Sequence, residues 1–206
     1  MAVTDQINIS NLYSYGPGWD WGSATSSFVS QSSYGTIIEL DFSGLAMHDR
    51  ITKITLSASM PHVDGEYYSD NLIGKLFSSL ADAKADTNPK ARNTVALQKP
   101  NSYYGKFMLD FADLSLDVKS FSDKKLFIRI WAEDSSMYTL YRHSFGDYPA
   151  PQVGVEILSG CVKIKIGNEA KMAIPCIYTR GKWRQAIPYS YVKIKDYTLS
   201  QWHICT

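Results

Sequence analysis

Few residues in this chain have the types and spacing that enzyme chemistry requires. The four histidines are scattered, and none belongs to a His-Glu-x-x-His pair that could hold zinc. They are His48, His62, His143 and His203. The sequence also contains no Gly-x-Ser-x-Gly nucleophile turn and no glycine-rich phosphate loop. We therefore expect a protein that is not an enzyme, with no catalytic residues and no cofactor. A glycan hydrolase is the least favoured alternative. It is kept because a sandwich fold can bring together two carboxylates that are far apart in the sequence.

The remaining candidates for metal or thiol chemistry are equally weak. The cysteines Cys161, Cys176 and Cys205 lack the Cys-x-x-Cys spacing of zinc sites, so we expect reduced, partly buried thiols. Three acidic residues could bind calcium together with a neighbouring asparagine, but their spacing is not that of a dedicated calcium loop. These residues are Asp64, Glu66, Asp70 and Asn71. The sequence therefore predicts no metal site.

Aromatic side chains are the strongest signal of binding. The chain has 14 Tyr, 8 Phe and 5 Trp, and four of these rings surround Gly16-Pro17-Gly18. They belong to Tyr13, Tyr15, Trp19 and Trp21. The two glycines and the proline at the centre of this segment predict that the rings lie on a loop. The loop either offers Tyr15, Trp19 and Trp21 as a platform for a sugar or a partner chain, or folds over the core and buries its own rings.

A second candidate surface lies on the clearest predicted strand, residues 125–133. Leu126, Ile128, Ile130 and Ala132 alternate with Phe127, Arg129, Trp131 and Glu133. The first set should face the core. Arg129 and Trp131 on the other face either form the floor of a groove or are covered by another segment.

These candidates must be positioned by strands, because the patterns elsewhere are also those of strands. Residues 36–42, 51–60, 106–112 and 153–158 alternate in the same way, and residues 79–93 form the one helical or irregular interlude. In residues 36–42, Ile38, Leu40 and Phe42 should face inward and Ile37, Glu39 and Asp41 the solvent. About eight strands with almost no helix predict an all-β fold. We expect an antiparallel β-sandwich, or jelly roll, over residues 1–158.

Residues 159–206 repeat a short pattern and form a second predicted unit. The segment 164–175 aligns with 177–188, and each copy ends in Ala-Ile-Pro. Each copy predicts a β-hairpin, and a third, degraded copy starts at Val192. One hairpin is too small to bury a hydrophobic face, so the copies should stack on each other or on a neighbour. The candidates for attachment or oligomer contacts are Arg180, Lys182, Trp183, Tyr189, Tyr191 and Trp202.

The charge balance limits the partners. With 21 basic and 20 acidic residues, the chain lacks the positive excess of a nucleic-acid or anionic-membrane surface. No apolar run has the length of a membrane span, and the polar start is not that of a signal peptide. We expect neither nucleic acid nor membrane as a partner, and synthesis in a cytoplasm.

Two parts of the chain resemble known families. The repeats around Gly181-Lys182-Trp183-Arg184 and Ala186-Ile187-Pro188-Tyr189 resemble short repeated tails on structural proteins of phages and phage-tail-like particles from Gram-positive hosts. The first unit, especially residues 105–131, resembles the carbohydrate-binding jelly rolls often built into virions. The first repeat departs from this pattern, because Ala170 stands where the second has Trp183.

The resemblance implies a virion structural protein, such as a decoration, tail or baseplate component. Its partners would be other virion or tail-particle proteins and copies of itself, in a homo-oligomer or symmetric array. It would be assembled in the bacterial host cytoplasm and localised to the virion. The alternative that the resemblance implies is a receptor-recognition module whose partner is a host cell-surface glycan.

One prediction concerns Trp183, the only tryptophan in the two aligned hairpins. Its ring should supply much of the apolar area that the hairpin can bury. We expect Trp183→Ala to open residues 162–206 to protease while the sandwich melts near its original temperature. Limited proteolysis with mass spectrometry measures this. An unchanged digestion pattern would contradict it.

Overall fold

The computed structural model describes most of the first unit and the strands of the second. The described residues are 2–30, 34–45, 49–61, 71–101, 104–133, 138–158, 162–166, 169–173, 176–179, 182–185, 192–196 and 201–205. No helix in these ranges is long and apolar enough to cross a membrane.

Two antiparallel sheets share the long strand β1 (Ala2–Gly16). In the first sheet, the N-terminal part of β1 is followed by β13 (Gln152–Leu158), β5 (Arg50–Pro61), β9 (Tyr104–Phe111) and β8 (Gln98–Asn101), and β10 (Leu116–Asp117) pairs with β5. In the second sheet, the C-terminal part of β1 is followed by β4 (Gly35–Asp41), β11 (Lys125–Ala132), β6 (Asn71–Phe77) and β7 (Ala91–Ala96), and β2 (Trp19–Ser23) also pairs with β1.

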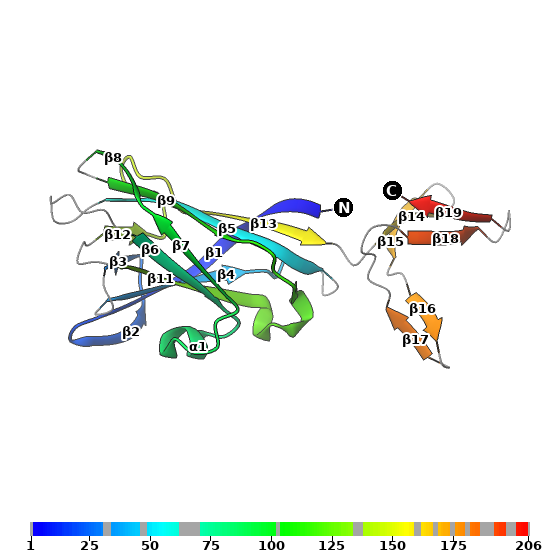
Figure 1. Ribbon diagram of the computed structural model, residues 1–206, viewed down its shortest axis with the longest axis horizontal. Coiled ribbons are helices and arrows are strands. Elements are labelled where there is room, and N and C mark those ends of the chain that lie inside the picture. The colour runs from blue at the N-terminus through cyan, green and yellow to red at the C-terminus, as the bar shows by residue number, and fades with distance from the viewer. Residues whose placement is uncertain are drawn as a thin grey trace.

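Short elements complete the first unit. The strands β3 (Ser26–Val29) and β12 (Tyr138–Tyr141) pair with each other, and their side chains Val29, Tyr138 and Leu140 are buried in the core. One α-helix and two 3-10 turns join strands: α1 (Leu80–Ala85), η1 (Val118–Ser120) and η2 (Ser122–Lys124). Figure 1 shows the strands of the two sheets as layers with α1 at one side.

The core lies between the two sheets and is built by the alternating residues that the sequence predicted. Ile54, Leu56, Ala58 and Met60 of β5, Phe107, Leu109 and Phe111 of β9, and Leu126, Ile128 and Ile130 of β11 are all buried in one cluster. A Cβ placed on Gly74 of β6 would lie 2.5 Å from Leu109 Cδ1, so the sheets are in close contact there. The predicted all-β sandwich is confirmed.

The outer face of β4 is buried at Ile37 and Glu39, which corrects the prediction of a solvent-facing side for residues 36–42. Ile37 is fully buried, and it packs with Phe77, Ala83 and Phe127 beneath Tyr13, Trp21 and Leu80. Glu39 is only 4% exposed. The alternation predicted a half-buried strand because it cannot show that α1 and the β1–β2 hairpin cover this face.

The glycine-rich segment near the N-terminus is not a loop, which corrects a second prediction. Tyr13 and Tyr15 lie in β1, and Trp19 and Trp21 lie in β2. Only Pro17 and Gly18 form the turn between these strands, and Gly18 has a φ of 88°. The wide aromatic rings suit the strands, while the positive φ requires glycine only at the turn.

The helical interlude is shorter than predicted. Ser79 caps α1 by accepting a hydrogen bond from the Asp82 backbone N–H, and Asp86 ends the helix in the left-handed conformation. A helix of six residues is followed by β7 from Ala91, inside the predicted interlude of residues 79–93. The β7 strand pairs with β6 along its length, and this pairing outweighs the weak local preference for helix.

Three hairpins follow the sandwich, as the repeat predicted. They are β14 (Val162–Ile166) with β15 (Glu169–Ala173), β16 (Cys176–Thr179) with β17 (Lys182–Gln185), and β18 (Val192–Asp196) with β19 (Gln201–Cys205). In Figure 1 they lie beyond the end of β13. Among the described strands each hairpin forms its own two-stranded sheet, so stacking of the copies stays a prediction. The predicted boundary at residues 159–160 lies outside the described residues.

Candidate functional site

Four of the five predicted binding residues meet on the outer face of the second sheet. Tyr15 stacks on Trp21 with ring centroids 5.4 Å apart. The Arg129 guanidinium lies 5.5 Å from the centre of the Trp21 ring and 5.9 Å from that of Trp131. Lys75 Nζ also lies over Trp131, at 5.1 Å. The fifth residue, Trp19, lies in β2, and the structure describes only its backbone.

Two of these four residues, Trp21 and Arg129, also stabilise the fold. A Cβ on Gly35 would lie 2.5 Å from Trp21 Cη2, so the indole ring packs directly on the β4 backbone. Arg129 Nη1 donates to the carbonyls of Ala83 and Lys84, each at 3.1 Å, and so satisfies the last carbonyls of α1. Burial lowers the pKa of Arg129, and the nearby Asp86 carboxylate opposes that change. Trp21 and Arg129 therefore fix the hairpin and the helix on the sheet.

A small pocket lies beside Arg129 and Trp131. Its volume is about 170 Å³, and its lining residues are Tyr34, Asp86, Arg129 and Trp131. Lys75 Nζ contacts both oxygens of Asp86, at 2.7 and 2.9 Å, and so holds the carboxylate at the rim.

A buried carboxylate lies elsewhere on the same sheet face, on β4. Glu39 accepts hydrogen bonds from Ser10 Oγ at 2.7 Å, Tyr13 Oη at 2.6 Å and Lys125 Nζ at 2.8 Å. Burial alone raises the pKa of Glu39, but the bonds from Lys125, Tyr13 and Ser10 outweigh it and leave the pKa below its usual value. Because all of its partners are donors that favour the ionised form, Glu39 is a structural group.

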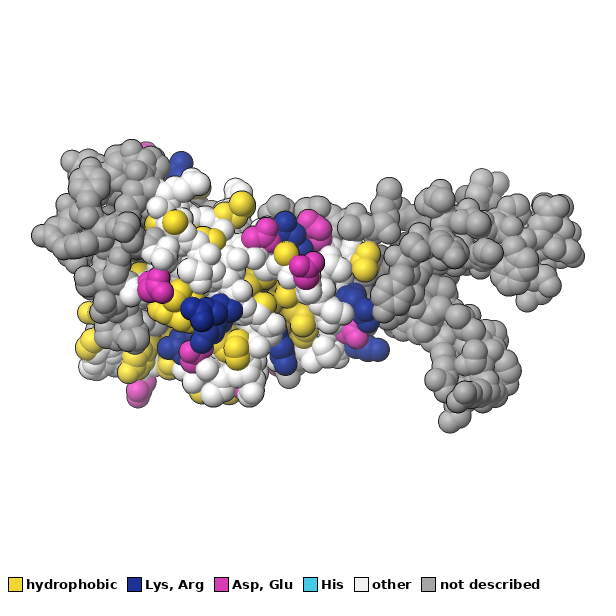
Figure 2. Space-filling model, in the orientation of Figure 1, with side chains coloured by type: hydrophobic (Ala, Val, Ile, Leu, Met, Phe, Trp, Pro, Cys, Tyr) yellow, Lys and Arg dark blue, Asp and Glu magenta, His cyan; other side chains and the backbone are white. Residues whose placement is uncertain are grey.

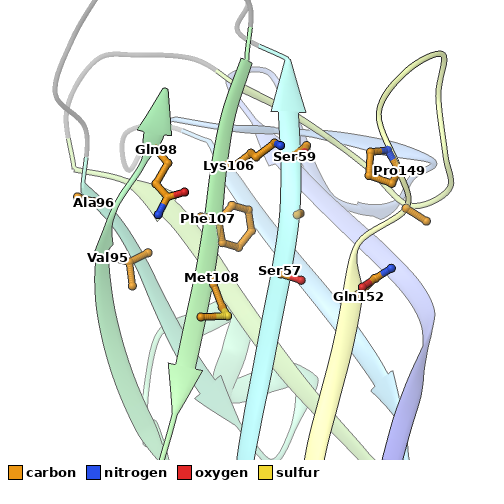
Figure 3. Close-up of a pocket in the computed structure, with 12 residues that line it drawn as sticks. Ser57, Ser59, Val95, Ala96, Gln98, Lys106, Phe107, Met108, Pro149 and Gln152 are labelled. Carbon is orange, nitrogen blue, oxygen red and sulfur yellow. The ribbon is translucent and has the colours of Figure 1, made fainter. Parts of the chain in front are cut away.

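A larger hollow than the pocket beside Trp131 lies on the outer face of the first sheet, and the sequence did not predict it. The open groove has a volume of about 600 Å³ and crosses β8, β9, β5 and β13. Figure 3 shows its labelled side chains on these strands, with Val95 and Ala96 at one side and Pro149 at the other.

Strand register arranges the groove side chains in two rows. Met108, Ser57 and Gln152 are paired neighbours across β9, β5 and β13. Gln98, Lys106 and Ser59 are paired neighbours across β8, β9 and β5. Lys106 points from β9 toward Ser59 in Figure 3. Met108 is 60% exposed and presents an apolar thioether among hydroxyl, amide and ammonium groups. The rows thus offer many hydrogen-bonding groups around one apolar contact.

The groove has the chemistry of a binding surface. None of its described lining residues is Asp, Glu, His or Cys. Hydroxyls and amides both donate and accept hydrogen bonds, which suits a ligand rich in hydroxyl groups. On the face in view in Figure 2, acidic and basic side chains are interspersed.

The remaining predicted residues lie mostly beyond what the structure describes. Lys182 and Trp183 are in β17 and Trp202 is in β19, and only their backbone is described. Arg180, Tyr189 and Tyr191 lie outside the described residues, as do the acids Asp64, Glu66 and Asp70. In the described part of the chain, no group of three or more His, Cys, Asp or Glu side chains could hold a metal ion.

Comparisons with known proteins find similarity among solved structures. No protein-family model matches the sequence, and no curated protein matches it. A solved structure described as a xylan-binding module CBM15 is similar, with a TM-score of 0.46 and 8% sequence identity. The likeness covers 77% of this chain and 99% of that chain. Because it is this distant, we take neither a site nor a ligand from it. The predicted relation to phage particles is not tested by these comparisons.

Proposed function

We propose that the sandwich is a non-catalytic carbohydrate-binding module that holds a glycan chain in the groove of the first sheet. The observation that carries this proposal is the pair of register-matched rows around Met108. The groove crosses four neighbouring strands, and with an interstrand spacing of about 4.8 Å its floor is about 14 Å wide from β8 to β13. That width suits an extended ligand of several sugar units.

The type of surface favours a glycan over a peptide. Peptides that bind sheets commonly add a strand to an exposed edge, where backbone groups are available. The floor of this groove is instead the side-chain face of paired strands. Its neutral polar contacts are Ser57, Ser59, Gln98 and Gln152, and Lys106 adds one ammonium group. Such neutral groups, with the thioether of Met108 and the ring of Pro149 as apolar contacts, match the hydroxyls and C–H faces of sugars.

The lining also favours binding over cleavage. Most glycoside hydrolases use two carboxyl groups on either side of the scissile bond. The described lining of the groove contains no carboxylate. The carboxylate on the second sheet that is most buried, Glu39, is engaged by three donors. These observations support a binding module over a glycoside hydrolase.

Affinity electrophoresis of the full chain through gels that contain soluble plant, bacterial-wall or algal polysaccharides tests this function. We expect at least one polysaccharide to retard the protein. A variant with Gln98→Ala, Met108→Ala and Gln152→Ala should bind about tenfold or more weakly, because it loses side chains from both rows. All three residues are exposed, so stability should change by less than about 0.5 kcal/mol for each substitution.

The matched control replaces two exposed residues near the opposite end of β5, Ser115→Ala and Lys119→Ala. It should migrate like the wild type in every gel. Equal retardation of the groove variant and the control would reject the groove as the site. Free migration of the wild type in all gels would reject carbohydrate binding.

A second proposal concerns residues 159–206, which we propose attach the sandwich to a particle or to other copies of the chain. A two-stranded hairpin alone is only marginally stable in water. The described strands β14 to β19 pair only within their own hairpins, which supports a need for a partner. Virion proteins and a symmetric homo-oligomer are the partners we propose, with the virion as the location. Light scattering of the full chain and of residues 1–158 tests self-association, which monomer masses for both would contradict. Cosedimentation of the full chain with particles tests attachment to a particle.

A further inference from the structure

The pocket between Tyr34, Asp86, Arg129 and Trp131 is separate from the groove. It lies on the outer face of the second sheet, whereas the groove lies on the outer face of the first. The two sites share no lining residue. A ligand in one therefore does not occupy the other.

The size of the pocket limits its ligand to one small ring. Its volume of about 170 Å³ equals that of roughly six water molecules, each with a share of about 30 Å³ in the liquid. Drug-sized ligands need pockets of about 300 Å³ or more. One sugar ring with its hydroxyl groups fits this space, and a chain does not.

The walls supply the two kinds of contact that a sugar needs. Trp131 and Tyr34 are partly buried aromatic side chains that can cover the C–H face of a ring. Asp86 has two carboxylate oxygens with several acceptor sites, and Arg129 has five N–H donors. Lys75 uses part of the acceptor capacity of Asp86, and α1 uses Nη1 of Arg129. The geometry therefore offers both an acceptor and a donor beside aromatic walls.

The charges favour a neutral ligand. Asp86 is paired with Lys75 at 2.7 Å. The Arg129 guanidinium faces the carbonyls at the C-terminal end of α1, which carry partial negative charge. The two charged residues in the described lining, Asp86 and Arg129, have opposite charges, so the lining itself has no net charge to attract an anion.

The helix positions Asp86 at the rim. Asp86 adopts a φ of 57° and a ψ of 40°, and its backbone N–H donates to the Asp82 carbonyl. Asn occupies this left-handed conformation as readily as Asp. Asp86→Asn therefore removes the charge and the carboxylate without disturbing the end of the helix.

We infer that this pocket binds a single uncharged sugar residue, at the end of a glycan, independently of the groove. The inference rests on the proposed function, since it assigns a second glycan site to the same module. Together the two sites would let the sandwich hold a chain on one face and a chain terminus on the other.

Saturation-transfer NMR of the full chain with methyl glycosides of neutral hexoses, pentoses and N-acetylhexosamines tests the inference. We expect at least one to bind with a dissociation constant on the order of 1 mM, as suits so small a ligand. Trp131→Ala and Asp86→Asn should each weaken this binding about tenfold or more. The groove variant should keep it while losing polysaccharide. If Trp131→Ala fails to fold, Asp86→Asn decides the result.

Three outcomes would overturn the inference. One is that no methyl glycoside binds while a polysaccharide still retards the protein, which leaves the groove proposal intact. The second is that a methyl uronide or inorganic phosphate binds in preference, with an affinity that falls as salt rises. The third is that the Ser115→Ala/Lys119→Ala control loses binding as fully as Asp86→Asn. Absence of both monosaccharide and polysaccharide binding would overturn the proposed function as well.

Discussion

Gly74→Ala is expected to lower the free energy of unfolding by about 2 kcal/mol, within the usual range for overpacked cores. The new Cβ would lie 2.5 Å from Leu109 Cδ1 and 3.2 Å from Phe111 Cζ, both in the core. The Leu109 side chain can shift only into neighbours that are themselves buried. The higher strand propensity of alanine offsets part of the loss. Chemical denaturation with matched m-values measures the effect.

A double-mutant cycle makes this prediction specific. Leu109→Ala alone should cost about 3 kcal/mol, because it leaves a cavity between the sheets. The Gly74→Ala/Leu109→Ala double variant should lose less than the sum of the two single changes, since the new methyl group fills part of that cavity. Gly44→Ala is the control, because a Cβ there meets nothing within 4 Å. Simple additivity in the cycle would show that the sheets do not meet at Gly74.

Lys125→Met is expected to cost about 2 kcal/mol at neutral pH, because it leaves the Glu39 carboxylate buried without its cation. The value lies below that for fully buried pairs, since 38% of the Lys125 side chain is exposed. Tyr13 and Ser10 still donate to Glu39 in the variant. Lys119→Met, at an exposed position, is the matched control and should have little effect.

The loss should depend on pH in a defined direction. The folded-state pKa of Glu39 lies below its usual 4.5, so its contribution is present above that value and is lost as pH falls through the folded pKa. The pKa of Lys125 is raised above 10.5, mainly by its hydrogen bond to Glu39, so its contribution is complete below 10.5 and is lost at higher pH. Wild type and Lys125→Met should therefore converge in stability in strong acid. A difference that stays constant down to acid pH would contradict the account of Glu39.

The sequence predicted the inner faces of the strands well, because alternation reports directly on a core shared by two sheets. The inward sets of β5, β9 and β11 are the buried ones. The outer face of β4 was predicted wrongly. Ile37 is covered by Tyr13 of β1, Trp21 of β2 and Leu80 of α1. Glu39 is bonded by Ser10, Tyr13 and Lys125. A single strand does not indicate whether its polar side faces water or a partner such as Lys125.

The two candidate sites also differ in how far the sequence could predict them. Arg129 and Trp131 could be found because they alternate on one strand. Their meeting with Trp21 and Asp86 depends on how a hairpin and a helix fold onto the sheet. The groove could not be predicted, because Ser57, Met108 and Gln152 become neighbours only through the register of three strands. A pattern of small polar residues beside one methionine is typical of any solvent-facing strand.

The most direct test of the central claim is an NMR titration of the isotopically labelled full chain with the polysaccharide fragment that binds best in the gels. The claim predicts that the largest chemical-shift changes fall on the amides of Ser57, Ser59, Lys106, Met108 and Gln152, which belong to the two rows of the groove. The Gln98→Ala/Met108→Ala/Gln152→Ala variant should need about tenfold or more of the fragment to reach the same fraction of its shift changes. Saturating binding whose shifts avoid β5, β9 and β13, or no shifts with any fragment, would contradict the claim.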